Sequence, residues 1–400
     1  MLVLIAEAAA GGHRARWRPL RGARQRAAAR APDADHHASE DDLQPTFAVP
    51  LAVVVGKELS ALVAQESIGR ALSPSCRASL RHYDLGVMLP HVFVSGDAPL
   101  RPINTIAIKE VPWRTIKPDC LYVNDSAENI SVFGIEGESA RNPADLQPGA
   151  WIPRDQRSLA TQAGLVVWEP AEVMTLHLSH VMRRYAHEFI GLQEAQGYLD
   201  FVARGAPKLV EEVIGKIVTI NQFTDVLQRL VQEGISIRDI KSILDALAEW
   251  GRVEKDSVLL TEYVRSAMKR YISFRHTQSR DTLFVHLLDP EIEDVMRGAI
   301  RRTATNSFLA LDPLIAHDIL AALRREMSNL PASAQQPVIV TDLDLRRFVR
   351  KMVELEFPTL SVLSYQELAP ELNIQPISRI SMRPPPQEVA DATQSLRVNA

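Results

Sequence analysis

The densest group of side chains that could do chemistry is the histidine run LHLSHVMRRYAHEF, residues 176–189. His177 and His180 are three residues apart, so they share one face of a helix. His187 is nearly three turns beyond His177, about 15 Å along the axis at a rise of about 1.5 Å per residue. One straight helix cannot bring all three rings to one ion, and HExxH is absent. The spacing favours packing or surface histidines, and we expect no bound metal.

Paired carboxylates are the other candidates for catalysis. Because they lie on amphipathic helical patterns, solvated helix faces explain them without chemistry. The chain has no GxxxxGK[ST] loop, no GxGxxG loop and no GxSxG elbow, so a nucleotide site or a hydrolase of that kind is not predicted. We therefore expect no enzymatic activity and no cofactor. The pairs are Glu211-Glu212, Glu291/Glu293/Asp294 and Glu354/Glu356.

Arg238 and Asp239 open an apparent helix directly after Ser236, which we predict to be its N-cap. Aspartate is favourable near the positive N-terminus of a helix, whereas arginine is not. An arginine in that position often has a partner elsewhere, and arginine is favoured in interface ion pairs. A subunit or domain contact and a solvated side chain both remain open for Arg238.

The elements that must position these residues begin with a valine-rich run at 47–56, which indicates a buried strand. A helical pattern at 57–72, a second strand within 80–96 and one alternating strand at 103–116 follow, giving a small α/β domain. Residues 117–163 are rich in Pro, Gly and Asn and indicate a loop-rich insertion containing β-strands. Strand character returns at 165–170.

From 171 to 275 the pattern is mainly helical. Gly234 is predicted to follow the C-cap of the helix at 223–234, and Thr261 to cap the helix at 259–274. The rest is α/β again, with strands at 281–289, 337–342 and 360–368 and helices at 290–303, 313–328 and 343–357. We predict disorder for the leader at 1–44 and for the proline-rich tail from 383.

Composition narrows the function further. The 400 residues are 46% hydrophobic and 24% charged, and the formal net charge is -4, so no global basic field favours nucleic acid. The two cysteines, Cys76 and Cys120, form no CxxC or Cys/His motif, which predicts reduced thiols. The sequence has no run of about 18 apolar residues, which a membrane-spanning helix would need. An arginine-tailed nucleic-acid binder would depend on residues 14–30, and the near-neutral body argues against it.

The helical region resembles a known family over long, gapless runs: GLQEAQGYLDF at 191–201 and the continuous stretch at 206–272, including EWGRVEKD and LLTEYVR. It is similar to the export gate family of type III secretion systems, FHIPEP, and more to its injectisome branch than to its flagellar branch. VPLAVVVGKEL at 49–59, WEPAEVMTLHLSHV at 168–181 and FPTLSVLSYQELAPELNIQPI at 357–377 extend the likeness over about 47–382.

The resemblance implies an α+β multidomain fold: a thioredoxin-like α/β subdomain with an inserted ferredoxin-like subdomain, a helical bundle and a C-terminal α/β subdomain. The expected boundaries are a leader at 1–44, the first subdomain at 45–116 and 164–194, the insertion at 117–163, the helical subdomain at 195–275, the last subdomain at 276–382 and a tail at 383–400.

The resemblance also implies a docking platform for chaperone–substrate complexes that forms a ring of nine copies under an export channel. Other partners would be export apparatus proteins, and nucleic acid would not be one. For docking we expect Leu176, His177 and His180. For ring contacts we expect Arg238, Asp239, Glu262, Arg265 and Arg270, with intramolecular ion pairs as the competing explanation.

Family members carry an N-terminal membrane domain, which this sequence does not resemble. The expected location is the cytoplasmic face of the bacterial inner membrane, or the cytoplasm for this chain alone. The alternatives are a non-functional truncated remnant of the gate protein and a soluble hydrolase using His/Glu pairs.

Overall fold

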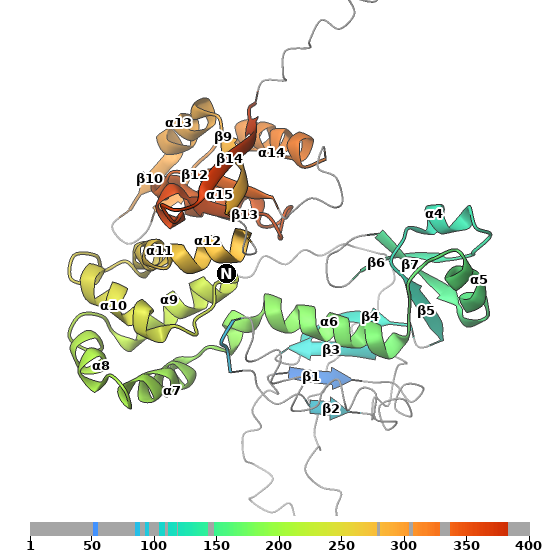
Figure 1. Cartoon of the computed structure of the whole chain (residues 1–400), viewed down its shortest axis with the longest axis horizontal. Helices are drawn as coiled ribbons and strands as arrows, with labels where there is room; N and C mark the ends of the chain where they lie inside the picture. The colour runs from blue at the N-terminus through green and yellow to red at the C-terminus, as the bar shows by residue number, and fades with distance from the viewer. Residues whose placement is uncertain are drawn as a thin grey trace, which may run out of the picture. The chain divides into compact units, whose positions relative to one another are not determined.

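A computed structural model describes residues 51–54, 85–88, 93–95, 104–108, 111–117, 119–142, 148–277, 281–303, 307–328 and 337–382. The chain divides into two compact units, Met1–Ser73 with Pro90–Leu178 and Pro74–Leu89 with Ser179–Ala400. The predicted leader, the helix at 57–72, Cys76 and the tail from 383 lie outside the described residues. The predicted mixture of helix and sheet is confirmed (Figure 1).

The first unit contains a sheet of order β2-β1-β3-β4. β1 (Leu51–Val54) pairs in parallel with β2 (Phe93–Ser95) and antiparallel with β3 (Asn104–Ile108). β3 turns back into β4 (Val111–Ile116), so the single strand predicted at 103–116 is wrong. The alternation of apolar and polar residues continues through both strands, so the sequence pattern alone did not separate them.

A second, wholly antiparallel sheet of order β6-β7-β5-β8 follows in the same unit. Its elements are β5 (Cys120–Val123), α4 (Ala127–Ser131), β6 (Glu138–Arg141), β7 (Pro148–Pro153), η2 (Arg154–Gln156), α5 (Arg157–Gln162) and β8 (Val167–Trp168). Its small core includes Leu121, Ile130 and Ile152. β8 pairs with β5, so this sheet extends beyond the insertion boundary predicted at residue 163. Helix α6 (Pro170–Arg184) comes next.

The second unit begins with a helical bundle. Its elements are η3 (Ala186–Phe189), α7 (Leu192–Ala203), α8 (Pro207–Val213), α9 (Ile220–Gln232), α10 (Ile240–Trp250), α11 (Ser257–Ala267) and α12 (Lys269–Thr277). A capping box between Thr219 and Gln222 starts α9. Gly234, at φ +74°, follows its C-cap as predicted.

Two predicted caps are wrong. Asp239 is the N-cap of α10, and its carboxylate accepts the Ser242 N–H at 3.1 Å. Asp256 is the N-cap of α11 and accepts the Val258 N–H at 2.9 Å. Ser236 and Thr261 lose these positions because aspartate, with two charged oxygens, competes well for the free N–H groups of a first turn.

Residues 85–88, which precede β2 in the sequence, also belong to this bundle. The Leu85 carbonyl accepts the Ile237 N–H at 2.9 Å, and the Tyr198 hydroxyl accepts the Met88 N–H at 3.0 Å. The predicted subdomain at 45–116 is therefore interrupted at 74–89.

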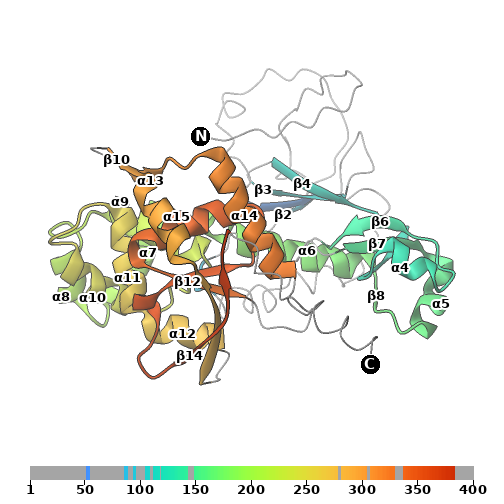
Figure 2. The ribbon, with the colours of Figure 1, turned by 90° about the horizontal axis from the view of Figure 1, so that it is seen from above.

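The C-terminal part of the second unit is a parallel sheet of order β13-β12-β9-β14. Helices α13, α14 and α15 pack around it (Figure 2). The elements are β9 (Thr282–Leu288), α13 (Pro290–Ala299), the hairpin β10 (Ile300–Arg302) and β11 (Ser307–Leu309), α14 (Pro313–Ser328), β12 (Val338–Thr341), α15 (Leu343–Val353), β13 (Ser361–Ser364), η4 (Tyr365–Glu367) and β14 (Asn373–Ile380).

β12 is buried along its whole length, as expected of a central parallel strand with an unbroken apolar run. The helix predicted at 290–303 ends instead at Ala299, where the chain enters β10. β14 was not predicted. It is an edge strand whose residues are mostly exposed, so it lacks the apolar run that marks the others.

Candidate functional site

The residues predicted for docking lie on α6. Leu176 and His180 are half-buried, and their role stays a prediction. His177 is only 1% exposed. Its ring is therefore enclosed, so a contact with a docked partner would require it to become exposed, and its docking role stays a prediction.

The residues predicted for ring contacts separate into two groups. Arg238, Asp239 and Arg270 are exposed, so a contact through them stays a prediction. Glu262 and Arg265 are 3% and 2% exposed. Both make ion pairs within the chain, so their assignment to a ring contact is wrong and the competing explanation holds for them.

Glu262 and Arg265 belong to a buried charge cluster of five side chains that joins the helical bundle to the C-terminal α/β part. Glu233 is the C-cap of α9, Glu262 and Arg265 lie one turn apart on α11, Arg346 is on α15 and Glu367 is in η4. Gly234 ends α9 directly after Glu233, which places that carboxylate at the junction.

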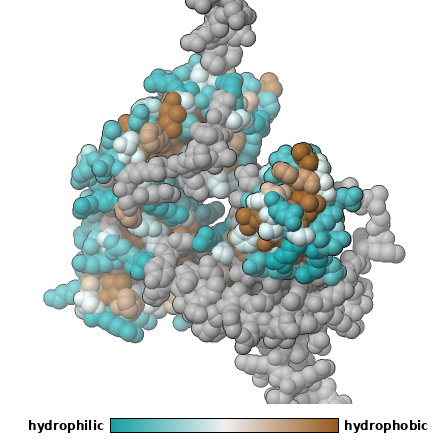
Figure 3. Space-filling model, turned by 45° about the vertical axis from the view of Figure 1, so that its right-hand side comes forward, coloured by the Kyte–Doolittle hydropathy of each residue, from teal (hydrophilic) through white to brown (hydrophobic). Residues whose placement is uncertain are grey.

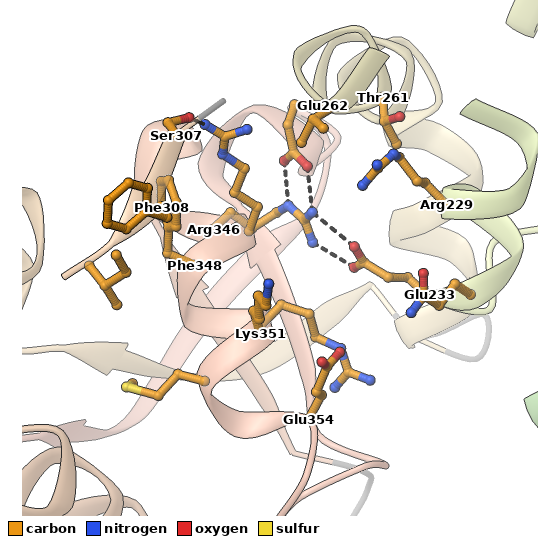
Figure 4. A pocket seen from close by; sticks show the side chains of 16 residues that line it. Arg229, Glu233, Thr261, Glu262, Ser307, Phe308, Arg346, Phe348, Lys351 and Glu354 are labelled. Carbon is orange, nitrogen blue, oxygen red and sulfur yellow. Dashed lines mark hydrogen bonds and ion pairs between the residues drawn. The ribbon is translucent and has the colours of Figure 1, made fainter. Parts of the chain in front are cut away.

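Arg346 is the centre of the cluster. Its guanidinium donates to both oxygens of Glu262, at 2.5 Å each, and to the two oxygens of Glu233 at 2.6 and 3.0 Å (Figure 4). Arg265 donates to Glu367 at 3.0 and 2.6 Å and to Glu233 at 3.0 Å. Such two-pronged arginine–carboxylate pairs are the strong, geometrically specific kind.

The two arginines keep Glu233 ionised despite burial. Burial raises the pKa of Glu233, but Arg265 and Arg346 lower it further and leave it at about 2. Burial lowers the pKa of Arg346, yet Glu233 and Glu262 raise it well above its ordinary value. The arrangement can bind the two parts of this unit together.

Sequence reasoning missed Arg346 and Glu367. A usable signal was present for Arg346, because it lies on the apolar face of α15 with Val349 and Val353 at helical spacing. An arginine on a buried face requires a carboxylate partner. Glu367 carried no comparable pattern.

A pocket of about 670 Å³ opens beside the cluster. One wall is α15, another is formed by α9 and α11, and the β10–β11 hairpin supplies the third (Figure 4). Arg346, Glu233 and Glu262 form part of its lining, together with Arg347, Phe308 and others. Its size is that of a site for a few side chains or a small molecule.

Within the described ranges, no three His, Cys, Asp or Glu side chains are placed to hold one metal ion. None of the described helices is both long enough and apolar enough to cross a membrane. Cys120 is a free thiol.

Comparison with known proteins identifies relatives of this chain. Residues 1–373 match the FHIPEP family model. Low calcium response locus protein D of Yersinia pestis is 36% identical over 344 residues, covering 85% of this chain and 48% of that protein. Invasion protein InvA of Salmonella typhimurium is 30% identical over 349 residues, covering 85% and 49%. The chain thus spans about half the length of these curated relatives.

Solved structures are similar along almost their whole length. The CdsV protein of Chlamydia pneumoniae in complex with CdsO has a TM-score of 0.74 and 38% identity, covering 85% of this chain and 100% of that one. The nonameric SctV-C of EPEC has a TM-score of 0.67 and 26% identity, covering 84% and 99%. With a family model matching most of its length and relatives of 30% identity or more, this chain belongs to the FHIPEP family.

Proposed function

We propose that this chain is the cytoplasmic part of a type III secretion export gate, which docks chaperone–substrate complexes and assembles as a homo-oligomeric ring. The observation that carries the proposal is the likeness to the nonameric SctV-C over 99% of its solved chain. The role is one of binding, and we propose no catalytic step. The proposed location is the cytoplasmic face of the bacterial inner membrane.

The subdomain layout is part of the proposal. The sheet β1–β4 with α6 would be the thioredoxin-like subdomain, and the sheet β5–β8 with α4 and α5 would be the ferredoxin-like insertion. The bundle α7–α12 and the parallel sheet with α13–α15 would be the helical and C-terminal α/β subdomains. The same order was predicted from sequence.

Exposed apolar side chains on the β5–β8 lobe support a docking role. Val132 is 82% exposed, Phe133 49% and Val166 64%. Apolar side chains are visible on this lobe in Figure 3. Exposed apolar surface of this kind is typical of sites that bind other proteins. Leu176 and His180 remain the proposed contacts on α6.

Ring formation is tested by light scattering on the full chain over a concentration series. We expect oligomers that dissociate in Arg238→Glu, since Arg238 is exposed and reversing its charge opposes an ion pair with a neighbour. Lys208→Glu, an exposed residue on α8, is the matched control and should leave the mass unchanged.

Docking is tested separately, by binding of a chaperone–substrate complex from the same secretion system to immobilised chain. Phe133→Asp should weaken that binding and leave the oligomer intact. A chain that stays monomeric at every concentration and binds no such complex would refute the proposal. Binding partners among export apparatus proteins are proposed by analogy with the CdsV–CdsO complex.

A further inference from the structure

The pocket beside the charge cluster is lined by more positively than negatively charged side chains. Arg346 is fully engaged by Glu233 and Glu262. Arg229 pairs with Asp225 one turn earlier on α9, at 3.0 Å. These two cations are therefore neutralised within the chain.

Three further cations of α15 line the same pocket: Arg347, Arg350 and Lys351. Arg347 donates to the Ser307 hydroxyl, and Arg350 donates to the Leu360 carbonyl at 2.6 Å and the Pro358 carbonyl at 3.3 Å. Among the described residues, none of the three has a carboxylate within ion-pair distance. Glu354 is the one lining carboxylate outside the buried cluster, and five cations line the pocket with three carboxylates, so the lining carries a net positive charge.

Burial outweighs the nearby charges at both arginines. It lowers the pKa of Arg347, although Asp256 and Glu262 raise it in part. It also lowers the pKa of Arg350, although Glu233 and Glu354 raise it in part. Arginine stays protonated in proteins, so an anion entering the pocket would stabilise each partly desolvated guanidinium.

The remaining wall is apolar. Phe308 at the hairpin is 49% exposed, and Phe348 and Met352 also line the pocket. The Arg347 guanidinium lies 4.6 Å from the centre of the Phe348 ring, which orients it. A ligand that fits this lining must carry negative charge and an apolar group together.

We propose that this pocket binds an acidic segment of a partner protein, with carboxylates contacting Arg347 and Lys351 and an adjacent apolar side chain packing against Phe308. Carboxylates match arginine in planar, two-pronged pairs. A free phosphate would leave the apolar wall unused and would face Glu354. The site goes beyond ring assembly and chaperone docking, because its lining comes from α9, α11, α15 and the β10–β11 hairpin and includes neither Arg238 nor any residue of the β5–β8 lobe.

The test is fluorescence anisotropy with the full chain and a labelled hexapeptide, Glu-Glu-Phe-Glu-Leu-Glu. The matched peptide carries glutamine in place of each glutamate. We expect the acidic peptide to bind at least tenfold more tightly, and its affinity to fall as salt rises. Lys351→Glu should weaken it tenfold or more. Lys351 and Lys241 on α10 are both exposed, so Lys241→Glu is the control and should bind as the parent chain does.

Four results would overturn the proposal. The two peptides could bind equally, or Lys351→Glu could bind the acidic peptide unchanged. Inorganic phosphate could displace the peptide at concentrations that leave ionic strength unaltered, which would identify a small-anion site. Finally, Lys351→Glu could change the oligomer mass in a chain that binds no peptide, which would assign the pocket to a second copy. Arg238→Glu tests the ring without touching this pocket, so the two failures are distinguishable.

Discussion

Replacing Arg346 by methionine should destabilise the second unit strongly. Arg346 is 1% exposed and makes four hydrogen bonds to Glu233 and Glu262. Methionine fills much of the same volume but removes the charge. Glu233 keeps Arg265, whereas Glu262, whose side chain is 5% exposed, loses its ion-pair partner. Removing one member of a buried ion pair costs about 3–5 kcal/mol.

The control is the same substitution at an exposed pair. Arg324 pairs with Glu356, and their side chains are 46% and 31% exposed. Exposed pairs contribute about 0–1 kcal/mol, so Arg324→Met should change little. Urea unfolding of the full chain, followed by far-ultraviolet circular dichroism, measures both variants against the parent chain.

A second variant separates charge from packing. In the double variant Arg346→Met/Glu262→Leu the stranded carboxylate is gone, and most of the lost stability should return. The reasoning is refuted if Arg346→Met and Arg324→Met lower stability equally, or if adding Glu262→Leu makes Arg346→Met worse.

Three smaller perturbations test other parts of the chain. Burial and Arg275 lower the pKa of His276 to about 4, whereas in the unfolded chain its pKa is near the ordinary value of about 6.5. The free energy of unfolding is therefore at its full value above about pH 6.5. It falls by about 2 kcal/mol between pH 7 and 5, because the unfolded chain binds the proton first. His276→Gln should flatten the fall in a pH series of urea midpoints. A Cβ at Gly149 would lie 1.9 Å from the Tyr122 hydroxyl, so Gly149→Ala should lower the stability of the β5–β8 sheet by about 1–3 kcal/mol, measured by thermal unfolding; no loss would contradict the close approach. Tyr198→Phe removes the acceptor for the Met88 N–H and should cost about 1 kcal/mol, seen as faster amide exchange at Met88; unchanged exchange would count against that bond.

Local pattern determined most of the elements of this protein. The apolar run at 337–342 became β12, and the helix predicted at 313–328 is α14 with those limits. Gly234 ended its helix as predicted, because a positive φ at the residue after a C-cap is a local requirement that glycine meets. Long sequence runs in the helical region also indicated the family, and the comparisons confirm it.

Where two local structures fit the same stretch of sequence, the sequence pattern alone predicted the wrong one. Ser236 and Asp239 are both good caps, and the structure uses Asp239. Alternation through 103–116 fits one long strand as well as the hairpin β3–β4. β14 lacks an apolar run because it is an exposed edge strand, and its pairing with β9 defines it.

The candidate site was decided by tertiary structure. Glu262 and Arg265 read as exposed charges on α11, and only the packing of α15 and η4 against that helix buries them. Arg346 is 84 residues from Glu262 and 113 from Glu233 in sequence. Periodicity reports which face of one helix is apolar, whereas an ion pair between distant segments depends on which faces meet, and that information lies in no single segment.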